Sequence, residues 1–166
     1  MKPALVDMPE VVDKVRAGLD DPAQADRLAV TVAPGTPRLT ADPLRTQQAL
    51  ANIVANALAY SAPSSKVALK VAPQARGGRP GVAVTVRDQG VGLTPEQRGQ
   101  VYDAFWRAGA LPDVPGNGLG MTIVREIVAV HGGQVEIASQ PGDGTEVTLW
   151  LPVESALAGG KAGAAA

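Results

Sequence analysis

Residues 42–60 read DPLRTQQALANIVANALAY, a pattern that predicts one long amphipathic helix. Asp42 can cap the first turn with its carboxylate, and Pro43 suits the first helical position, where no backbone N–H has to be bonded. Apolar side chains recur at the spacing of one helix face, namely Leu50, Ile53, Val54, Ala57 and Leu58. This helix must therefore bury one face against another layer of structure.

Shorter elements of both kinds flank this helix. Runs rich in β-branched residues predict strands at 28–32, 66–71, 82–86, 134–138 and 145–151. Helical patterns occupy residues 8–20, 95–105 and 119–131. On the last of these, one apolar face is predicted, made by Ile123, Ile127 and Val130 with Val124 and Val128 beside them. The alternation predicts an α/β (α+β) two-layer sandwich, in which helices cover one face of a mixed sheet.

The chain length of 166 residues fits one domain, which we assign to residues 1–153. Residues 154–166 are low in complexity, and we expect a flexible tail there. The composition is 45% hydrophobic but only 3% aromatic, so the core must consist of aliphatic side chains. No apolar run approaches the roughly 20 residues that cross a bilayer. We therefore expect no direct contact with a membrane.

Charge and residue usage exclude several classes of function. The formal net charge is -1, from 15 basic and 16 acidic residues, without the Lys and Arg clusters that bind nucleic acid. There is no cysteine and a single histidine, His131, which excludes thiolate and multi-histidine metal sites. His131 precedes Gly132-Gly133 at a predicted helix end, where we expect a structural role.

Two asparagines interrupt the pattern of the 42–60 helix. Asn52 and Asn56 are four residues apart and therefore share one face. Because asparagine is a poor helix former, this pair needs a reason. An amide oxygen is a suitable ligand for Mg²⁺, and a pair of hydrogen bonds from the helix to a loop is the alternative.

A second polar motif, Asp88-Gln89-Gly90-Val91-Gly92, follows the predicted strand at 82–86. An aspartate at a strand end can accept a hydrogen bond from the exocyclic amine of a base. The alternative is an Asp-Gly turn without a ligand, which is common.

Glycines also open the helix predicted at 119–131, in Gly116-Asn117-Gly118-Leu119-Gly120. Backbone N–H groups at a helix start, approached closely because glycine has no side chain, can bind phosphate. The motif is neither a P-loop nor a dinucleotide fingerprint, since no Gly-Lys-Ser/Thr follows and Met121 replaces the third glycine. A plain loop remains the alternative.

Aromatic residues concentrate in the stretch 101–107, VYDAFWR. Phe105 and its neighbours can anchor a mobile loop to the body of the domain, and Arg107 can reach a phosphate. A small hydrophobic cluster under a long loop is the alternative.

The order of these motifs is more specific than any one of them. Together they resemble the catalytic domain of histidine kinases, in the superfamily of the gyrase, Hsp90 and MutL ATPases, over residues 7–153. The N, G1, F and G2 boxes and the last glycine motif correspond to residues 52–61, 88–92, 102–107, 116–121 and 142–145. The resemblance implies a Bergerat fold with a flexible ATP lid at about residues 93–115.

The resemblance also implies a role for each matching residue, with ATP and Mg²⁺ as cofactors. Asp88 would bind the adenine amine, in a pocket shaped by Gly90, Gly92 and Leu93 and supported by Thr145. Asn56 would hold Mg²⁺, Asn52 and Tyr60 would line the phosphate and base side, and Phe105 would anchor the lid. Phosphate contacts are implied for Gly116, Asn117, Gly118, Leu119 and Gly120. The implied catalytic residues are Asn52, Asn56 and Arg107.

The implied reaction transfers a phosphoryl group from ATP to a histidine. We expect that histidine on a dimerisation domain outside this chain, and we expect a response regulator to receive the group afterwards. The chain alone would be a cytoplasmic monomer, and the longer receptor would be anchored in the inner membrane.

Two positions depart from the family pattern. Ala59 stands where the family has Lys, Arg or His, which leaves open a docking module with a degenerate nucleotide site. Asn52 stands where the superfamily ATPases carry a catalytic glutamate, which disfavours the alternative of an ATPase because no carboxylate would activate water. A related serine kinase is the remaining alternative.

Overall fold

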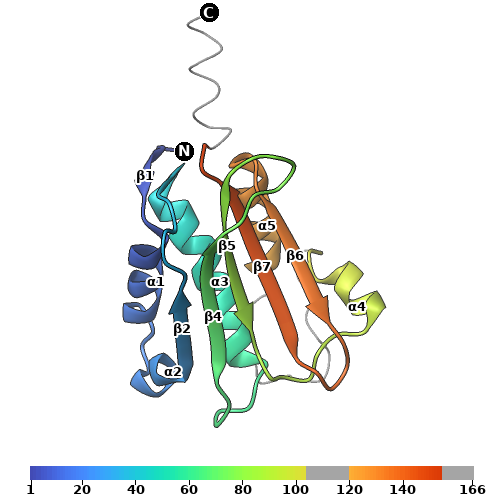
Figure 1. Ribbon diagram of the computed structural model, residues 1–166. Coiled ribbons are helices and arrows are strands. Elements are labelled where there is room, and N and C mark those ends of the chain that lie inside the picture. The colour runs from blue at the N-terminus through green and yellow to red at the C-terminus, as the bar shows by residue number, and fades with distance from the viewer. Residues whose placement is uncertain (104–119, 155–166) are drawn as a thin grey trace, which may run out of the picture.

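The computed structural model describes residues 1–103 and 120–154. Its main sheet has five strands in the order β2-β4-β5-β7-β6 (Figure 1). Strand β2 runs parallel to β4, and every other neighbouring pair is antiparallel, so the sheet is mixed as predicted. The strands are β2 (Leu28–Val32), β4 (Val67–Pro73), β5 (Gly81–Arg87), β6 (Gln134–Ser139) and β7 (Thr145–Pro152).

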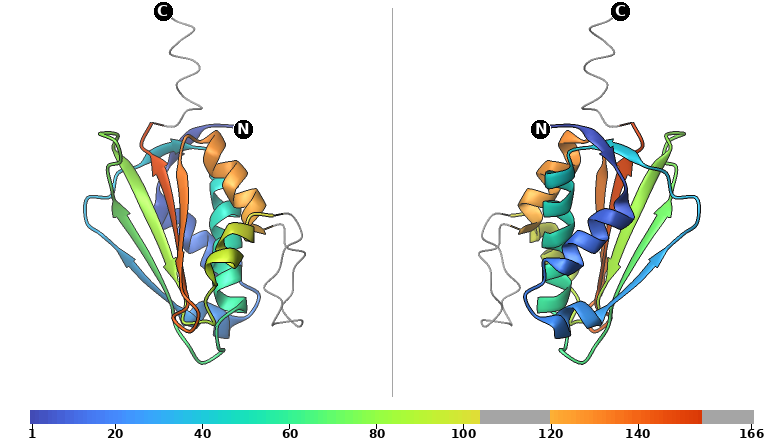
Figure 2. Two further views of the ribbon diagram at one scale, coloured as in Figure 1. Left: turned by 90° about the vertical axis from the view of Figure 1, so that its right-hand side faces the viewer. Right: turned by 90° about the vertical axis from the view of Figure 1, so that its left-hand side faces the viewer.

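Helices cover one face of this sheet, which confirms the two-layer prediction. The long helices α1 (Met8–Ala17), α3 (Pro43–Ala59) and α5 (Gly120–Val130) lie on that side (Figure 2). Alternate residues of β4 point into the aliphatic core between the layers, while Ala68 and Lys70 between them are exposed. The two short helices, α2 (Pro22–Arg27) and α4 (Pro95–Gln100), lie near the ends of strands.

Helix α3 forms for the reasons that its sequence predicts. The Asp42 carboxylate accepts a hydrogen bond from the backbone N–H of Arg45 at 3.1 Å, which caps the first turn. The whole predicted stripe is buried, and Ala49 extends it. The polar face of α3 is thereby fixed in direction, with Asn52 and Asn56 turned toward the start of α5.

The predicted face of α5 is partly wrong. Val130 is 46% exposed, whereas Met121 is buried with Val124, Ile127 and Val128. The buried face of α5 therefore begins at Met121, two residues earlier than predicted. Val130 is in the last turn and faces solvent, whereas Val128 and His131, close to it in the sequence, are buried.

Three short elements were not predicted from the pattern. Strands β1 (Ala4–Val6) and β3 (Leu39–Ala41) form a separate two-stranded antiparallel sheet, and α2 has six residues. Segments this short carry too little periodicity to be recognised. They form because the rest of the fold brings them together.

Candidate functional site

Asp88 follows β5 directly and is only 6% exposed. Its Oδ1 atom accepts hydrogen bonds from the backbone N–H groups of Gly90 at 2.8 Å and Thr145 at 3.1 Å. Burial raises the pKa of this carboxyl, and the two N–H donors oppose that rise. Oδ2 has no hydrogen-bond partner within residues 1–103 and 120–154, so it can accept one from a ligand.

The loop after Asp88 packs closely against the end of α3 and against the turn between β6 and β7. A side chain on Gly90 would overlap the carbonyl oxygen of Tyr60, at the end of α3. Gly92 has a φ of 73°, and a side chain there would overlap the carbonyl of Gln140. Both glycines are therefore required for the loop to pack this closely against its neighbours.

Ser139 joins this loop to the turn between β6 and β7. Its hydroxyl accepts from the Leu93 N–H at 2.7 Å, donates to the Gly144 carbonyl at 2.8 Å, and lies 2.9 Å from the Thr145 hydroxyl. Sequence reasoning missed Ser139, because a lone serine at the end of a strand carries no signal. Leu93 and Thr145, which were predicted, are fixed through it.

A second group of predicted residues gathers where α3 faces the first residue of α5. The Asn52 amide donates to the Gly120 carbonyl at 3.3 Å, and the Asn56 Nδ2 atom lies 3.9 Å from a Cβ built on Gly120. Asn56 is half-buried, and its side chain makes no hydrogen bond to another residue of the described ranges. Its amide thus remains available for a ligand.

These residues fit a magnesium ion that is shared with a nucleotide. Among the described residues no group of three or more His, Cys, Asp or Glu side chains could cage a metal. Mg²⁺ keeps several waters and takes oxygen ligands from one or two side chains and from substrate phosphates. A single amide oxygen, from Asn56, suits that mode of binding.

Six predicted site residues lie outside the described residues: Phe105, Arg107, Gly116, Asn117, Gly118 and Leu119. The described residues that flank this segment, near Tyr102 and at the start of α5, contact one another or α3. Thr122 in the first turn of α5 donates to the Tyr102 carbonyl at 2.7 Å, and the Arg125 guanidinium lies 5.1 Å from the centroid of the Tyr102 ring. Gly120 is bonded to Asn52 as described above.

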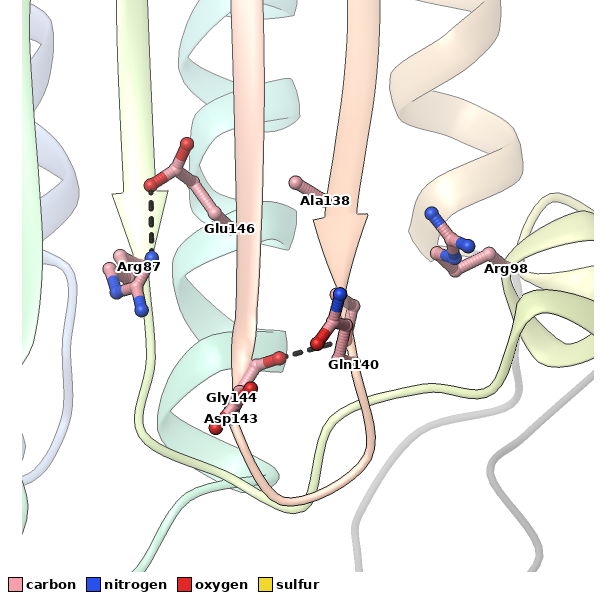
Figure 3. Close-up of a pocket in the computed structure, with 8 residues that line it drawn as sticks. Arg87, Arg98, Ala138, Gln140, Asp143, Gly144 and Glu146 are labelled. Atoms are coloured by element: carbon pink, nitrogen blue, oxygen red, sulfur yellow. Dashed lines mark hydrogen bonds and ion pairs between the residues drawn. The ribbon is translucent and has the colours of Figure 1, made fainter.

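A separate pocket of 310 Å³ opens beside the ends of β6 and β7 (Figure 3). Its lining carries two cations and two anions, and two of these, Arg87 of β5 and Glu146 of the neighbouring β7, form an ion pair at 3.4 Å. It shares Ser139 and Gly144 with the Asp88 site. Arg98 of α4 lines its far side (Figure 3). None of the predicted site residues that fall within 1–103 and 120–154 lines it.

Residues 41–155 match the family described as histidine kinase-, DNA gyrase B- and HSP90-like ATPase. That match covers most of the chain and includes both groups of site residues. The chain therefore belongs to this ATPase family.

Within the family, the chain is similar to sensor histidine kinases. It is 35% identical over 145 residues to SenX3 of Mycobacterium bovis, covering 86% of this chain and 34% of that protein. It is 34% identical over 143 residues to the methanogenesis regulatory kinase FilI of Methanothrix harundinacea, covering 86% of this chain and 16% of that protein. The chain thus spans 34% or less of the length of these relatives.

Solved structures agree with this placement. The mycobacterial sensor histidine kinase MprB is 29% identical, with a TM-score of 0.74 over 93% of this chain and 99% of that one. Full-length ShkA in complex with AMPPNP is 28% identical, with a TM-score of 0.77 over 94% of this chain and 32% of that one. The fold is the Bergerat fold of histidine kinase catalytic domains. In the described residues no helix is long and apolar enough to cross a membrane.

Proposed function

We propose that this chain is the part of a sensor histidine kinase that binds Mg²⁺-ATP and donates its γ-phosphoryl group to a histidine on another domain. The observation that carries the proposal is the buried Asp88 carboxylate with one oxygen bonded and the other unbonded. A purine amine would complete the hydrogen bonding of this carboxylate. The match to an ATPase family and the AMPPNP complex of ShkA support the same ligand.

The remaining site residues would contact different parts of the nucleotide. Tyr60, Gly90, Gly92, Leu93 and Thr145 would enclose the base around Asp88. Asn52, Asn56 and Gly120, at the meeting of α3 and α5, would face the phosphates. Gly116, Asn117, Gly118 and Leu119 would add backbone N–H groups, Phe105 would anchor the lid, and Arg107 would reach a phosphate.

A magnesium ion bound by Asn56 would neutralise phosphate charge and orient the terminal phosphate. The protein's own contribution is then positioning, because Asn52 and Asn56 supply amides and no carboxylate base. The Asn52 amide already donates to the Gly120 carbonyl. Water is therefore activated poorly, which favours transfer to a protein acceptor over hydrolysis.

His131 is unsuited to be that acceptor. It is 1% exposed, and its Nε2 atom accepts a hydrogen bond from the Asp42 N–H at 2.9 Å while Nδ1 lies 2.7 Å from the Ile127 carbonyl. Both ring nitrogens are thus engaged inside the fold. The acceptor would be a histidine on a dimerisation domain of the same receptor.

Further proposals follow from the likeness to sensor kinases. Residues 1–153 would form the catalytic domain, followed by a flexible tail at 154–166. The isolated chain would be a cytoplasmic monomer, part of a receptor anchored in the inner membrane. A response regulator would accept the phosphoryl group from the histidine.

Calorimetric titration with a non-hydrolysable ATP analogue, with and without Mg²⁺, tests the nucleotide site. We expect one-to-one binding that strengthens with Mg²⁺ and that Asn56→Ala makes insensitive to Mg²⁺. The exposed Asp143→Asn serves as a control that retains binding. Absence of binding at millimolar nucleotide would contradict the proposal. It would favour the alternative of a docking module with a degenerate nucleotide site, which the replacement of the family's cation by Ala59 supports.

The transfer itself is tested by adding the dimerisation domain of the longer receptor. Acid-labile, base-stable phosphorylation of that domain, dependent on Asn56, is the expected result. Phosphate release without a labelled domain would instead indicate an ATPase.

A further inference from the structure

Arg27, the last residue of α2, is a buried cation outside every motif of the nucleotide site. Its side chain is only 9% exposed. Within the described ranges, no carboxylate forms an ion pair with it. A buried guanidinium must be satisfied by other acceptors, since an unpartnered buried charge is strongly unfavourable.

The acceptors all belong to one segment, residues 58–65. Arg27 Nη1 donates to the Leu58 carbonyl at 3.2 Å, and Nη2 donates to the Ser61 hydroxyl at 2.7 Å and to the Ala62 carbonyl at 2.9 Å. Nε donates to the Ser65 carbonyl at 2.9 Å. One side chain therefore holds four oxygens of the end of α3 and the turn that follows.

This arrangement stabilises the C-terminal end of α3. The last carbonyls of a helix lack partners within the helix and carry partial negative charge, which a cation there offsets. Ser61, bonded to Arg27, in turn donates to the Ala57 carbonyl at 2.6 Å. The planar guanidinium fixes the direction of each bond, which a lysine ammonium does not.

The held segment includes Tyr60, which touches the loop that carries Asp88. The Tyr60 N–H is bonded to the Asn56 carbonyl at 3.0 Å, and the Tyr60 carbonyl lies against Gly90 so closely that no side chain fits there. The Gly90 N–H donates to Asp88 Oδ1. A chain of contacts thus runs from Arg27 through Tyr60 and Gly90 to the Asp88 carboxylate.

We propose that Arg27 is a positioning residue of the nucleotide site: by bonding to residues 58–65 it sets Tyr60 against Gly90 and so fixes the direction of the Asp88 carboxylate. This role rests on the proposed nucleotide binding. Arg27 itself touches neither base nor phosphate. Its effect passes through the end of α3.

Lys66 offers a matched control for this role. Its ammonium donates to the Asp26 carbonyl at 2.7 Å, so it links the same two regions of the chain. That bond is exposed and does not involve the end of α3. Lys66→Met removes a cation next to the same corner without releasing Tyr60.

The experiment compares Arg27→Met, Arg27→Lys and Lys66→Met with the unchanged chain. Binding of ADP is measured by calorimetry well below each melting temperature, and backbone hydrogen exchange is measured without nucleotide. For Arg27→Met we expect ADP binding to weaken about tenfold, which corresponds to about 1.4 kcal/mol. Exchange at Gly90 and Thr145 should accelerate, and the gain in affinity from Mg²⁺ should persist. Arg27→Lys should recover part of the loss, and Lys66→Met should bind normally.

The outcomes separate this role from the proposed function. A lower melting temperature with unchanged ADP affinity and unchanged exchange at Gly90 would mean that Arg27 only stabilises the fold. If Arg27→Met fails to fold, Arg27→Lys decides by the same two measurements. Failure of the unchanged chain to bind ADP overturns the nucleotide site, and with it the role of Arg27 there.

Discussion

Two polar side chains of helix α3, Asp42 at its N-cap and Asn56 near its other end, differ in how far they are satisfied. At the N-terminal end, Asp42 accepts hydrogen bonds from Arg45 at 3.1 Å and Lys2 at 2.7 Å, and its own N–H donates to His131 at 2.9 Å. Asp42 and His131 are 7% and 1% exposed. At the other end Asn56 is half-buried, and its amide lies near Gly120 at the start of α5.

The difference separates stability from function along a single helix. Buried polar groups that satisfy one another stabilise and orient the fold, whereas accessible groups without protein partners are available to a ligand. Changes at the Asp42 end should therefore lower stability and leave binding intact. Changes of the Asn56 or Asp88 side chain should instead weaken nucleotide binding and leave stability nearly unchanged.

The largest effect is expected from Asp88→Asn. Asparagine keeps an oxygen for the Gly90 and Thr145 N–H groups, so the loop should fold normally. Its amide NH2 group would face the amino group of the base, where the carboxylate would accept a hydrogen bond. The loss of a charged hydrogen bond costs up to about 3 kcal/mol, roughly a hundredfold in affinity. Calorimetry should show that loss with an unchanged melting temperature. Normal ATP binding in this variant would overturn the adenine pocket.

His131→Ala is the corresponding change at the N-terminal end of α3, where His131 contacts Asp42. It removes the acceptor for the Asp42 N–H and leaves a cavity between α3 and α5, which should lower the free energy of unfolding by about 2–3 kcal/mol. Urea denaturation measures the loss. His131→Gln, which retains an acceptor, should lose less. A large change in nucleotide affinity at full folding would show that the two ends of α3 are not independent.

The fold was predictable because its main signals are local and repeated. The stripe of α3, its cap at Asp42 and the β-branched strands each identify an element from neighbouring residues alone. The strand pairing β1–β3 and the exposure of Val130 were missed, because both depend on contacts between distant segments. Asp88, Gly90 and Thr145 come from two motifs and are joined by hydrogen bonds in the structure, whereas their role in nucleotide binding stays a prediction. Ser139 and Arg27 belong to no motif, and only the tertiary structure reveals what they hold.

Asp42→Ala should have a smaller effect that depends on pH. Loss of the helix cap costs about 1 kcal/mol near neutral pH. Hydrogen bonds from the Lys2 and Arg45 N–H groups lower the pKa of Asp42 below its ordinary value of 3.8. The ionised carboxylate therefore contributes its stability above that ordinary value and loses it as pH falls through the lowered pKa. Urea denaturation of both proteins should show the difference shrinking on acidification, and a constant difference would contradict the assignment.

The smallest effect is expected from Ala59→Lys, which restores the cation that the family pattern has at this position. Ala59 is half-buried and lies one turn after Asn56, so a lysine side chain can extend toward the phosphates. A partly exposed ion pair contributes about 0.5–1 kcal/mol, which is roughly a twofold to fivefold gain in ATP affinity. Because salt screens exposed charges, the gain should decline as salt is added. Ala129→Lys adds the same charge at an exposed position near the far end of α5 and should change nothing. Equal gains from both variants would mean that the overall charge of the protein, and not a cation at position 59, governs the attraction of ATP.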